Sequence, residues 1–366
     1  MQKARETQLE INLKALHHNF LQLKGKLQPQ TLFMAVVKAN AYGSDAVAVA
    51  KFLEDKADYF AVAYTSEGIE LREAGIRKPI LVLHPQSVHF EEIIHHCLEP
   101  ALYSHFVLNA FLKSAQLKKQ QHYPVHLKFN TGLNRLGFDP DEAKELARRI
   151  CENPEIKIRS VFSHLAASED PNERDFTLRQ IAFFSKIRSA ILEILPYKPL
   201  FHCTNTSGII NYPDAHFDMV RSGIGLYGYG NEARVDQSLK PIATLKTIIS
   251  QLHTIQPGDT VGYNRAFEAP EPQKIATLPI GHADGLSRRL GNGVGFVTIH
   301  GQKAPYVGNV CMDMLMVNVT GITCEEGDEV IVFGENPTAE TLAQSTETIT
   351  YEVLTKISKR IKRVVK

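Results

Sequence analysis

The sequence lacks the features that would place it in a membrane, secreted or nucleic-acid-binding class. No apolar run approaches the roughly 20 residues that a membrane-spanning helix needs, and the first ten residues contain no apolar signal-peptide segment. Lysine and arginine total 41 against 40 aspartate and glutamate. The formal net charge of +1 therefore creates no overall field for gripping nucleic acid or an acidic membrane. We expect neither as a partner.

Cysteine and the common catalytic motifs are also scarce. The cysteines are odd in number, widely spaced and without a C-x-x-C pair: Cys97, Cys151, Cys203, Cys311 and Cys324. This pattern fits neither a disulfide framework nor a zinc knuckle, and it indicates a reduced, cytoplasmic compartment. The motifs GxxxxGK[ST], HExxH and GxSxG are absent. The adjacent histidines of His17-His18 and His95-His96 would point in different directions on a helix, so we expect no metal site.

What is present is a long alternation of short apolar runs and amphipathic stretches. The chain has 366 residues, which predicts two domains. Eight apolar runs resemble strands buried on both faces of a parallel sheet: residues 32–38, 59–64, 80–84, 100–103, 125–129, 158–164, 200–204 and 217–221. Helical patterns such as residues 139–150 lie between them. Eight strands alternating with helices predict a (β/α)₈ barrel, and a doubly wound open sheet is the alternative.

The pattern changes after Tyr229. Short β-rich segments at residues 245–254, 296–300, 314–319 and 329–333 are separated by glycine-containing turns, which predicts a mainly-β module. A last helix is expected over residues 351–361, with the basic residues 356–366 on a solvated helix face. The predicted architecture is a TIM-type barrel at residues 9–232 followed by a mainly-β domain at 233–366, which residues 1–8 join. Residues 231–239 suit a linker.

Polar residues stand where the predicted barrel strands end: Lys38, His84, Tyr103, Lys128, His164, Thr204 and Arg221. Active sites of such barrels lie at this end, although any one of these residues could simply be a surface residue or an ion-pair partner. Lys38 follows a buried strand, where burial lowers the pKa of an amine and prepares it to form an imine.

Two loops at this end are rich in glycine and small hydroxyl residues. Residues 205–208 and 222–225 follow the last two strands, where such barrels often bind phosphate, although ordinary loop chemistry is the simpler interpretation. Residues 223–228 also match G-x-G-x-x-G. No helix is expected after them, so we exclude a dinucleotide site.

Six motifs together resemble those of the alanine racemase family, a group of fold type III pyridoxal-phosphate enzymes. They are VVKANAYG at residues 36–43, KFNTGLNRLG at 128–137, MVRSGI at 219–224, VGY at 261–263, PIGHADG at 279–285 and GNVCMD at 308–313. The resemblance implies a homodimer with composite sites that interconverts L- and D-alanine by two bases. It also implies pyridoxal 5′-phosphate as cofactor and D-alanine supply for peptidoglycan.

The resemblance also implies residue roles. Lys38 would hold the cofactor and act on the D-alanine face, and Tyr263 of a partner subunit would act on the L-alanine face. His164 would support Arg221 at the pyridine nitrogen, while Arg135 and Met312 would bind the substrate carboxylate. Lys128 matches a lysine that many relatives carry in carbamylated form. The phosphate would be held by Tyr42, Asn205, Thr206, Ser207, Gly223, Ile224 and Tyr351.

Two positions depart from the family pattern. Asn130 stands where many relatives have aspartate, and His282 stands where many have tyrosine near the substrate entrance. The alternatives are a racemase of serine or a basic amino acid, a non-catalytic pyridoxal-phosphate-binding protein, and an aldolase that uses Lys38. The β module with Tyr263 and Met312 argues against the second, because such binding proteins are single barrels. The aldolase explains neither this module nor Arg221.

Overall fold

The computed structural model describes residues 5–230 and 237–366, which form two compact units. The barrel unit comprises His17–Ala41 and Ala46–Lys240. The β unit comprises the chain up to Leu16, Tyr42–Asp45 and Pro241–Lys366. The predicted division between residues 232 and 233 lies outside the described residues, as do residues 231–236 of the predicted linker.

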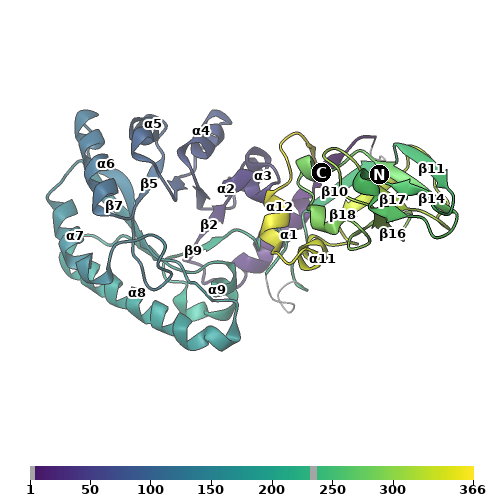
Figure 1. The fold of residues 1–366 in the computed structure, drawn as a ribbon. Coiled ribbons are helices and arrows are strands. Elements are labelled where there is room, and N and C mark those ends of the chain that lie inside the picture. The colour runs from purple at the N-terminus through teal and green to yellow at the C-terminus, as the bar shows by residue number, and fades with distance from the viewer. Residues whose placement is uncertain (1–4, 231–236) are drawn as a thin grey trace. The chain divides into compact units, whose positions relative to one another are not determined.

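The barrel unit contains an eight-stranded parallel sheet in the order β9-β2-β3-β4-β5-β6-β7-β8 (Figure 1). The strands are β2 (Leu32–Val36), β3 (Tyr59–Val62), β4 (Ile80–Val82), β5 (Glu99–Leu102), β6 (Tyr123–Lys128), β7 (Ile156–Phe162), β8 (Leu200–His202) and β9 (Met219–Ser222). The amide of Asp218 donates to Phe201 O at 3.0 Å and that of Arg221 to Thr204 O at 3.3 Å, which joins the two ends of the sheet. The eight predicted strands and the barrel are thus confirmed.

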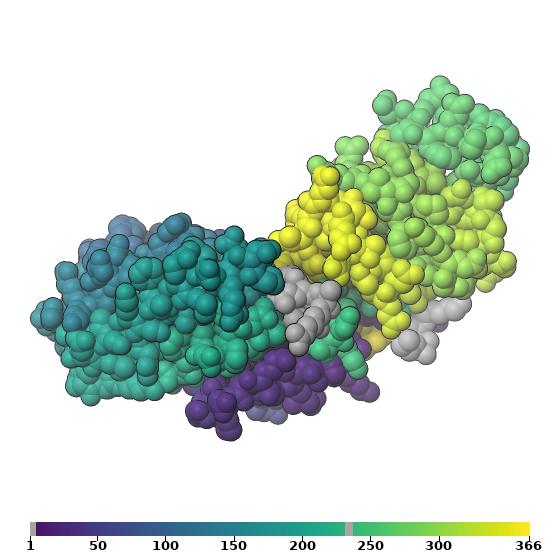
Figure 2. All heavy atoms as spheres, turned by 90° about the horizontal axis from the view of Figure 1, so that it is seen from below, coloured from purple at the N-terminus to yellow at the C-terminus, as the bar shows by residue number. Residues whose placement is uncertain are grey.

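Helices cover the outside of the sheet. They are α3 (Ala46–Leu53), α4 (Thr65–Glu73), α5 (Phe90–His95), α6 (His105–Leu117), α7 (Ala143–Cys151), α8 (Arg174–Ile194) and α9 (Thr206–Asn211). The segment labelled α2 (Lys38–Tyr42) is a left-handed turn rather than a covering helix. Figure 2 shows α7 and α8 in teal at the surface of this unit. The helix predicted over residues 139–150 begins with the 3₁₀ turn Pro140–Glu142 and continues as α7.

The eighth covering position is taken by a helix that precedes the barrel strands. Helix α1 (Leu13–Lys24) places Asn19 Nδ2 3.0 Å from Leu226 O, just after β9. Its Phe20 ring packs edge-on against Phe33 of β2 with centroids 5.0 Å apart. Helix α1 therefore packs beside β2 and the residues that follow β9, although it precedes both strands in the chain.

The β unit is a nine-stranded sheet in the order β11-β14-β17-β16-β15-β18-β10-β1-β19. Its strands are β1 (Gln8–Ile11), β10 (Ala243–Ile248), β11 (Gln251–Ile255), β14 (Gln273–Leu278), β15 (Phe296–Ile299), β16 (Gln302–Val307), β17 (Leu315–Asn318), β18 (Glu329–Phe333) and β19 (Lys362–Val365). The pair β12 (Thr260–Val261) and β13 (Phe267–Glu268) and the helices α11 (Ala339–Ser345) and α12 (Thr350–Thr355) complete it. The predicted mainly-β character is confirmed.

Two expectations for this unit are wrong in detail. The segment 245–254 is two strands rather than one, because the amides of Ile249 and Ser250 turn to Asp328 O and Thr277 O on different neighbours. The expected helix over 351–361 ends at Thr355, and Lys362–Val365 instead forms β19, which runs parallel to β1.

The basic C-terminal segment is therefore not a solvated helix face. The Arg363 guanidinium donates to Gly43 O at 2.9 Å and Ile357 O at 2.9 Å, so it holds this segment in place through backbone carbonyls. Figure 2 shows these yellow C-terminal residues beside the green strands of the same unit. Across residues 5–230 and 237–366, no helix combines the length and apolarity needed to cross a membrane.

Candidate active site

Four cationic side chains gather at the carboxyl ends of the barrel strands. Lys38 follows β2, Lys128 ends β6, Arg135 lies in the loop after β6, and Arg221 lies in β9. Burial and the positive charges of Arg135 and Arg221 lower the pKa of Lys38. Burial, followed by the same two arginines, lowers the pKa of Lys128 to about 8. The mutual repulsion indicates a site built to receive negative charge.

The backbone after Lys38 makes a left-handed turn. Ala39, Asn40, Ala41 and Tyr42 have φ between 51° and 54°, a conformation that costs an L-residue roughly 1–2 kcal/mol. The carboxylate of Glu67 accepts from Ala39 N at 2.6 Å and from Ala63 N at 2.7 Å. Such strain persists only where surrounding contacts impose it, and it concentrates at functional sites. Sequence reasoning missed Glu67, which has no local signal.

Arg221 is buried among acceptors. Its Nη2 lies 3.2 Å from His164 Nδ1 and 2.7 Å from Ser163 O, while its Nη1 lies 2.5 Å from His202 Nδ1. Burial, followed by the charge of Arg221, lowers the pKa of both histidines well below their usual range, so both are neutral acceptors. The structure thus brings the predicted His164 to Arg221. It adds His202, whose only sequence signal was a histidine ending an apolar strand.

The two predicted anion loops are neighbours. Thr206 Oγ1 lies 3.0 Å from Ser222 Oγ and accepts from Gly225 N at 3.3 Å. A Cβ on Gly225 would sit 2.5 Å from the Thr206 methyl group, so the approach requires glycine. Asn205 caps α9 through a 2.9 Å bond from Gly208 N. Ser207, Gly223 and Ile224 are buried beside these residues, and the loops offer hydroxyls and amides to an anion.

A buried hydroxyl beside these loops is unsatisfied. Within the described part of the chain, Thr204 Oγ1 has no hydrogen-bond partner although the residue is fully buried. Buried polar groups are nearly always paired, so an oxygen-rich ligand is a natural complement to it. This donor set fits a phosphate ester.

Asn130 shapes the loop that carries Arg135. Its Oδ1 accepts from Gly132 N at 3.1 Å and from Asn134 N at 3.0 Å. Gly137 has a φ of 136°, and a Cβ there would lie 2.5 Å from Asn130 N. An amide oxygen can accept both bonds as a carboxylate would, so the departure at residue 130 is compatible with this turn.

In the β unit, the motifs at residues 261–263 and 279–285 both contact the motif at residues 308–313. Asn309 Nδ2 donates to Tyr263 O at 3.1 Å, and the amide of His282 donates to Cys311 O at 2.9 Å. A Cβ on Gly281 would lie 2.3 Å from Met312 O, so this close crossing requires glycine. The loops that carry Tyr263, His282 and Met312 therefore form one rigid surface.

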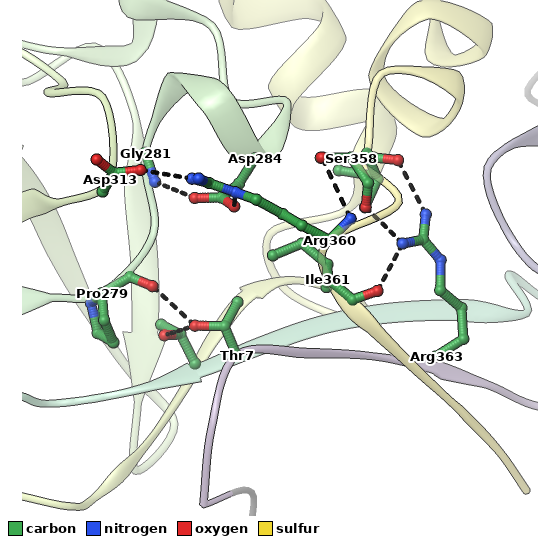
Figure 3. A network of polar contacts seen from close by, with 11 residues as sticks. Thr7, Pro279, Gly281, Asp284, Asp313, Ser358, Arg360, Ile361 and Arg363 are labelled. Atoms are coloured by element: carbon green, nitrogen blue, oxygen red, sulfur yellow. Dashed lines mark hydrogen bonds and ion pairs between the residues drawn. The ribbon is translucent and has the colours of Figure 1, made fainter.

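An arginine from the C-terminal segment clamps two of these loops (Figure 3). Arg360 Nε lies 2.6 Å from Asp284 Oδ1, and its Nη2 lies 2.7 Å from Asp313 Oδ1. The other oxygen of Asp284 accepts from Gly281 N at 2.8 Å. The two carboxylates raise the pKa of Arg360. Sequence reasoning missed this clamp, because its members lie 76 and 47 residues apart.

Tyr263 and Met312 point outward from this surface. They are 74% and 59% exposed and line one depression of about 750 Å³. Tyr263 is flanked by Gly262 with φ 79° and Asn264 with φ 62°, so a left-handed turn made by residues that tolerate it presents this side chain. Large exposed apolar side chains that line one depression indicate a contact surface rather than packing residues.

The two predicted tyrosines of the phosphate set also belong to the β unit. The rings of Tyr42 and Tyr351 lie 5.9 Å apart, although the residues come from opposite ends of the chain. Burial raises the pKa of Tyr42, so its hydroxyl stays a neutral donor. At the barrel rim, the rings of His84 and Tyr103 lie 5.8 Å apart.

Comparison with known proteins places this geometry in a family. Residues 11–231 match the alanine racemase N-terminal domain, and residues 242–365 match the alanine racemase C-terminal domain. Alanine racemase 1 of Oceanobacillus iheyensis is 36% identical over 98% of both chains.

Solved structures agree over the whole chain. The alanine racemase of Clostridium difficile 630 aligns with a TM-score of 0.93 and 35% identity, over 100% of this chain and 97% of that one. A Bartonella henselae alanine racemase with covalently bound pyridoxal phosphate aligns at 0.88 and 30%, over 99% of this chain and 100% of that one. The fold, the motifs and these matches agree: the chain belongs to the alanine racemase family and is an amino-acid racemase.

Proposed function

We propose that this protein interconverts L-alanine and D-alanine with pyridoxal 5′-phosphate as cofactor. The observation that carries the proposal is the cluster of Lys38, Lys128, Arg135 and Arg221 at the barrel mouth, where two lysines have lowered pKa values. A phosphorylated cofactor and the carboxylate of an amino acid supply the missing negative charge.

Lys38 would hold the cofactor covalently at Nζ, and burial, which lowers its pKa, favours the neutral amine that this bond requires. The phosphate would be held by Tyr42, Asn205, Thr206, Ser207, Gly223, Ile224 and Tyr351. When bound, the cofactor delocalises the electron pair left at the α-carbon and so makes the α-proton acidic. Arg221 has only donors, so it would keep the pyridine nitrogen unprotonated and restrain side reactions such as transamination.

Two proton-transfer groups on opposite faces of the α-carbon suit racemisation. Lys38 Nζ would take or return the proton on the D-alanine face, and the Tyr263 hydroxyl would do so on the L-alanine face. The Arg135 guanidinium and the Met312 amide would hold the substrate carboxylate. Burial, followed by the charges of Arg135 and Arg221, lowers the pKa of Lys128 to about 8, which favours the neutral amine that a carbamate would need; the negative charge of that carbamate would orient Arg135.

We infer a homodimer with composite sites from the outward-facing Tyr263 and Met312. A two-fold interface would give two identical sites, each with residues from both subunits. We further propose that the enzyme supplies D-alanine for peptidoglycan. Its cytoplasmic location stays a prediction.

The direct test is a racemisation assay of the purified protein with added pyridoxal phosphate. We expect L-alanine and D-alanine to be converted with kcat/KM at least about 100-fold above serine, lysine or arginine, as a site specific for the alanine methyl group would require. A higher value for serine or a basic amino acid would favour the alternative racemases. Cofactor binding without racemisation of any of these would favour a binding protein.

The Arg360 clamp should support substrate binding. Arg360→Leu would leave Asp284 and Asp313 without their shared partner and loosen the loop that carries Met312. We expect KM for alanine to rise roughly 5- to 10-fold, as for the loss of one charge-assisted hydrogen bond, with a smaller change in kcat. The matched control is Arg149→Leu on the outer helix α7, where the guanidinium donates to Asn109. An unchanged KM in Arg360→Leu would contradict the positioning role.

A further inference from the structure

A continuous chain of hydrogen bonds crosses the barrel from β5 to Arg221. His202 Nε2 lies 2.9 Å from Ser160 Oγ, and Ser160 Oγ lies 2.6 Å from His126 Nδ1. His126 Nε2 lies 2.7 Å from Glu99 Oε2, and Arg221 contacts His202 at the other end. His126, Ser160 and His202 are fully buried. Such a chain is costly unless every member is satisfied, so its presence demands a reason.

The strand register explains how these hydrogen-bonded side chains follow one another along the barrel. His126 of β6 pairs with Ser160 of β7, and His202 of β8 pairs with Phe162, two residues further along β7. Glu99 begins β5, two residues before Ala101, which pairs with His126. One member comes from each of β5, β6, β7, β8 and β9, so the chain connects the amino end of the barrel to the active-site end.

The chemistry of the members fixes the direction of donation. A guanidinium only donates, so His202 Nδ1 accepts as long as Arg221 keeps this position. The neutral His202 then carries its proton on Nε2 and donates to Ser160 Oγ. Among the described contacts, the remaining partner of the Ser160 hydroxyl is His126 Nδ1, which must accept the single hydroxyl proton. His126 therefore carries its proton on Nε2 and donates to the Glu99 carboxylate.

Glu99 ends this series of hydrogen bonds as a pure acceptor. Without it, His126 could move its proton to Nδ1 and donate to Ser160, and the hydroxyl would then donate to His202 Nε2. That reversal places a proton on His202 Nδ1, opposite the donors of Arg221. Two opposed donors repel, so Arg221 would leave its position. The Glu99 carboxylate also helps to raise the pKa of Tyr59 to about 12, after burial, as a negative charge at this end would.

We propose that Glu99 is a positioning residue for Arg221, and that it acts through His126, Ser160 and His202 by holding both imidazoles in the Nε2-protonated tautomer. The consequence for catalysis rests on the proposed placement of Arg221 at the pyridine nitrogen. The tautomers themselves do not depend on that placement.

The first test is ¹⁵N NMR of the histidine-labelled holoenzyme. We expect Nδ1 of His126 and His202 to resonate as unprotonated nitrogens and Nε2 as protonated ones. Glu99→Leu should shift His126 toward the Nδ1-protonated form, and Ser160→Ala should leave His202 as a mixture. Glu99→Gln retains an acceptor oxygen and should resemble the native protein. Thr177→Val removes a buried hydroxyl that donates to Ala167 O and takes no part in this series of hydrogen bonds. It should change neither tautomer.

The second test is the ratio of racemisation to transamination. We expect it to fall roughly 10-fold in Glu99→Leu and Ser160→Ala, as for one lost charge-assisted hydrogen bond, and to stay native in Glu99→Gln and Thr177→Val. Arg221→Glu serves as the reference for complete loss.

The two proposals fail in different ways. If Arg221→Glu leaves the ratio unchanged, the placement of Arg221 at the ring is wrong. The tautomer measurement then still tests whether Glu99 acts on His202 through the hydrogen-bond chain. If Arg221→Glu lowers the ratio while Glu99→Leu and Ser160→Ala keep native tautomers and ratios, the positioning role of Glu99 is overturned. A doubly protonated His126 in the native protein would overturn it too. Should Glu99→Leu fail to fold, Ser160→Ala carries both measurements.

Discussion

Lys38→Ala is expected to abolish covalent attachment of pyridoxal phosphate and to lower racemisation by roughly 10⁴-fold, the upper range for one acid–base group. A methyl group can neither bond to the cofactor nor carry a proton. Borohydride reduction followed by peptide mapping of the native protein should find the cofactor on the peptide containing Lys38. The absorption band of the bound cofactor should shift to that of the free form in the variant.

Lys144 provides the matched control for this substitution. It lies exposed on α7, paired with Glu193, so Lys144→Ala removes an amine without touching the barrel mouth. Native absorption and activity are expected there. Cofactor mapped to Lys128 in the native protein, or covalent attachment that survives in Lys38→Ala, would overturn the assignment.

Tyr263→Phe is expected to be asymmetric. Loss of the hydroxyl removes only the group assigned to the L-alanine face, so α-proton exchange of L-alanine should fall by roughly 10²-fold or more, while that of D-alanine falls far less. Exchange with deuterated solvent, followed by NMR for each enantiomer, measures both rates. Tyr197→Phe, at the amino end of the barrel strands, is the matched control.

Mixing the two inactive variants tests whether Tyr263 acts across a subunit interface. A heterodimer of Lys38→Ala and Tyr263→Phe would contain one composite site with native Lys38 and native Tyr263. Activity should therefore return to as much as about half of the native value per heterodimer. Equal loss of both exchange rates would contradict the face assignment. A purified heterodimer that regains nothing would contradict the composite site.

The barrel could be predicted from the sequence because its strands are buried on both faces. Runs such as Leu32–Val36 and Ile80–Val82 need apolar residues at nearly every position, and such a run can be recognised from a few consecutive residues of the sequence. The residues at the strand ends, Lys38 above all, stand out because polar side chains follow so many of these apolar runs. Six motifs in order across both domains then indicated the family.

Features made by distant contacts could not be predicted in this way. The strand Lys362–Val365 contains only four residues, two of them charged, and its pairing with Gln8–Ile11 places it in the sheet. Helix α1 packs beside β2 and the residues that follow β9, although it precedes them in the chain.

The polar networks follow the same rule. By itself, the sequence determined the alternating elements and the chemical types at the strand ends, because these depend on local periodicity and on residue identity. Only the tertiary structure decided that Arg360 joins Asp284 to Asp313, and that Glu99 reaches Arg221 through His202. The physical reason is that hydrogen bonds form between side chains that strand register and barrel closure bring together, and no local pattern encodes that register.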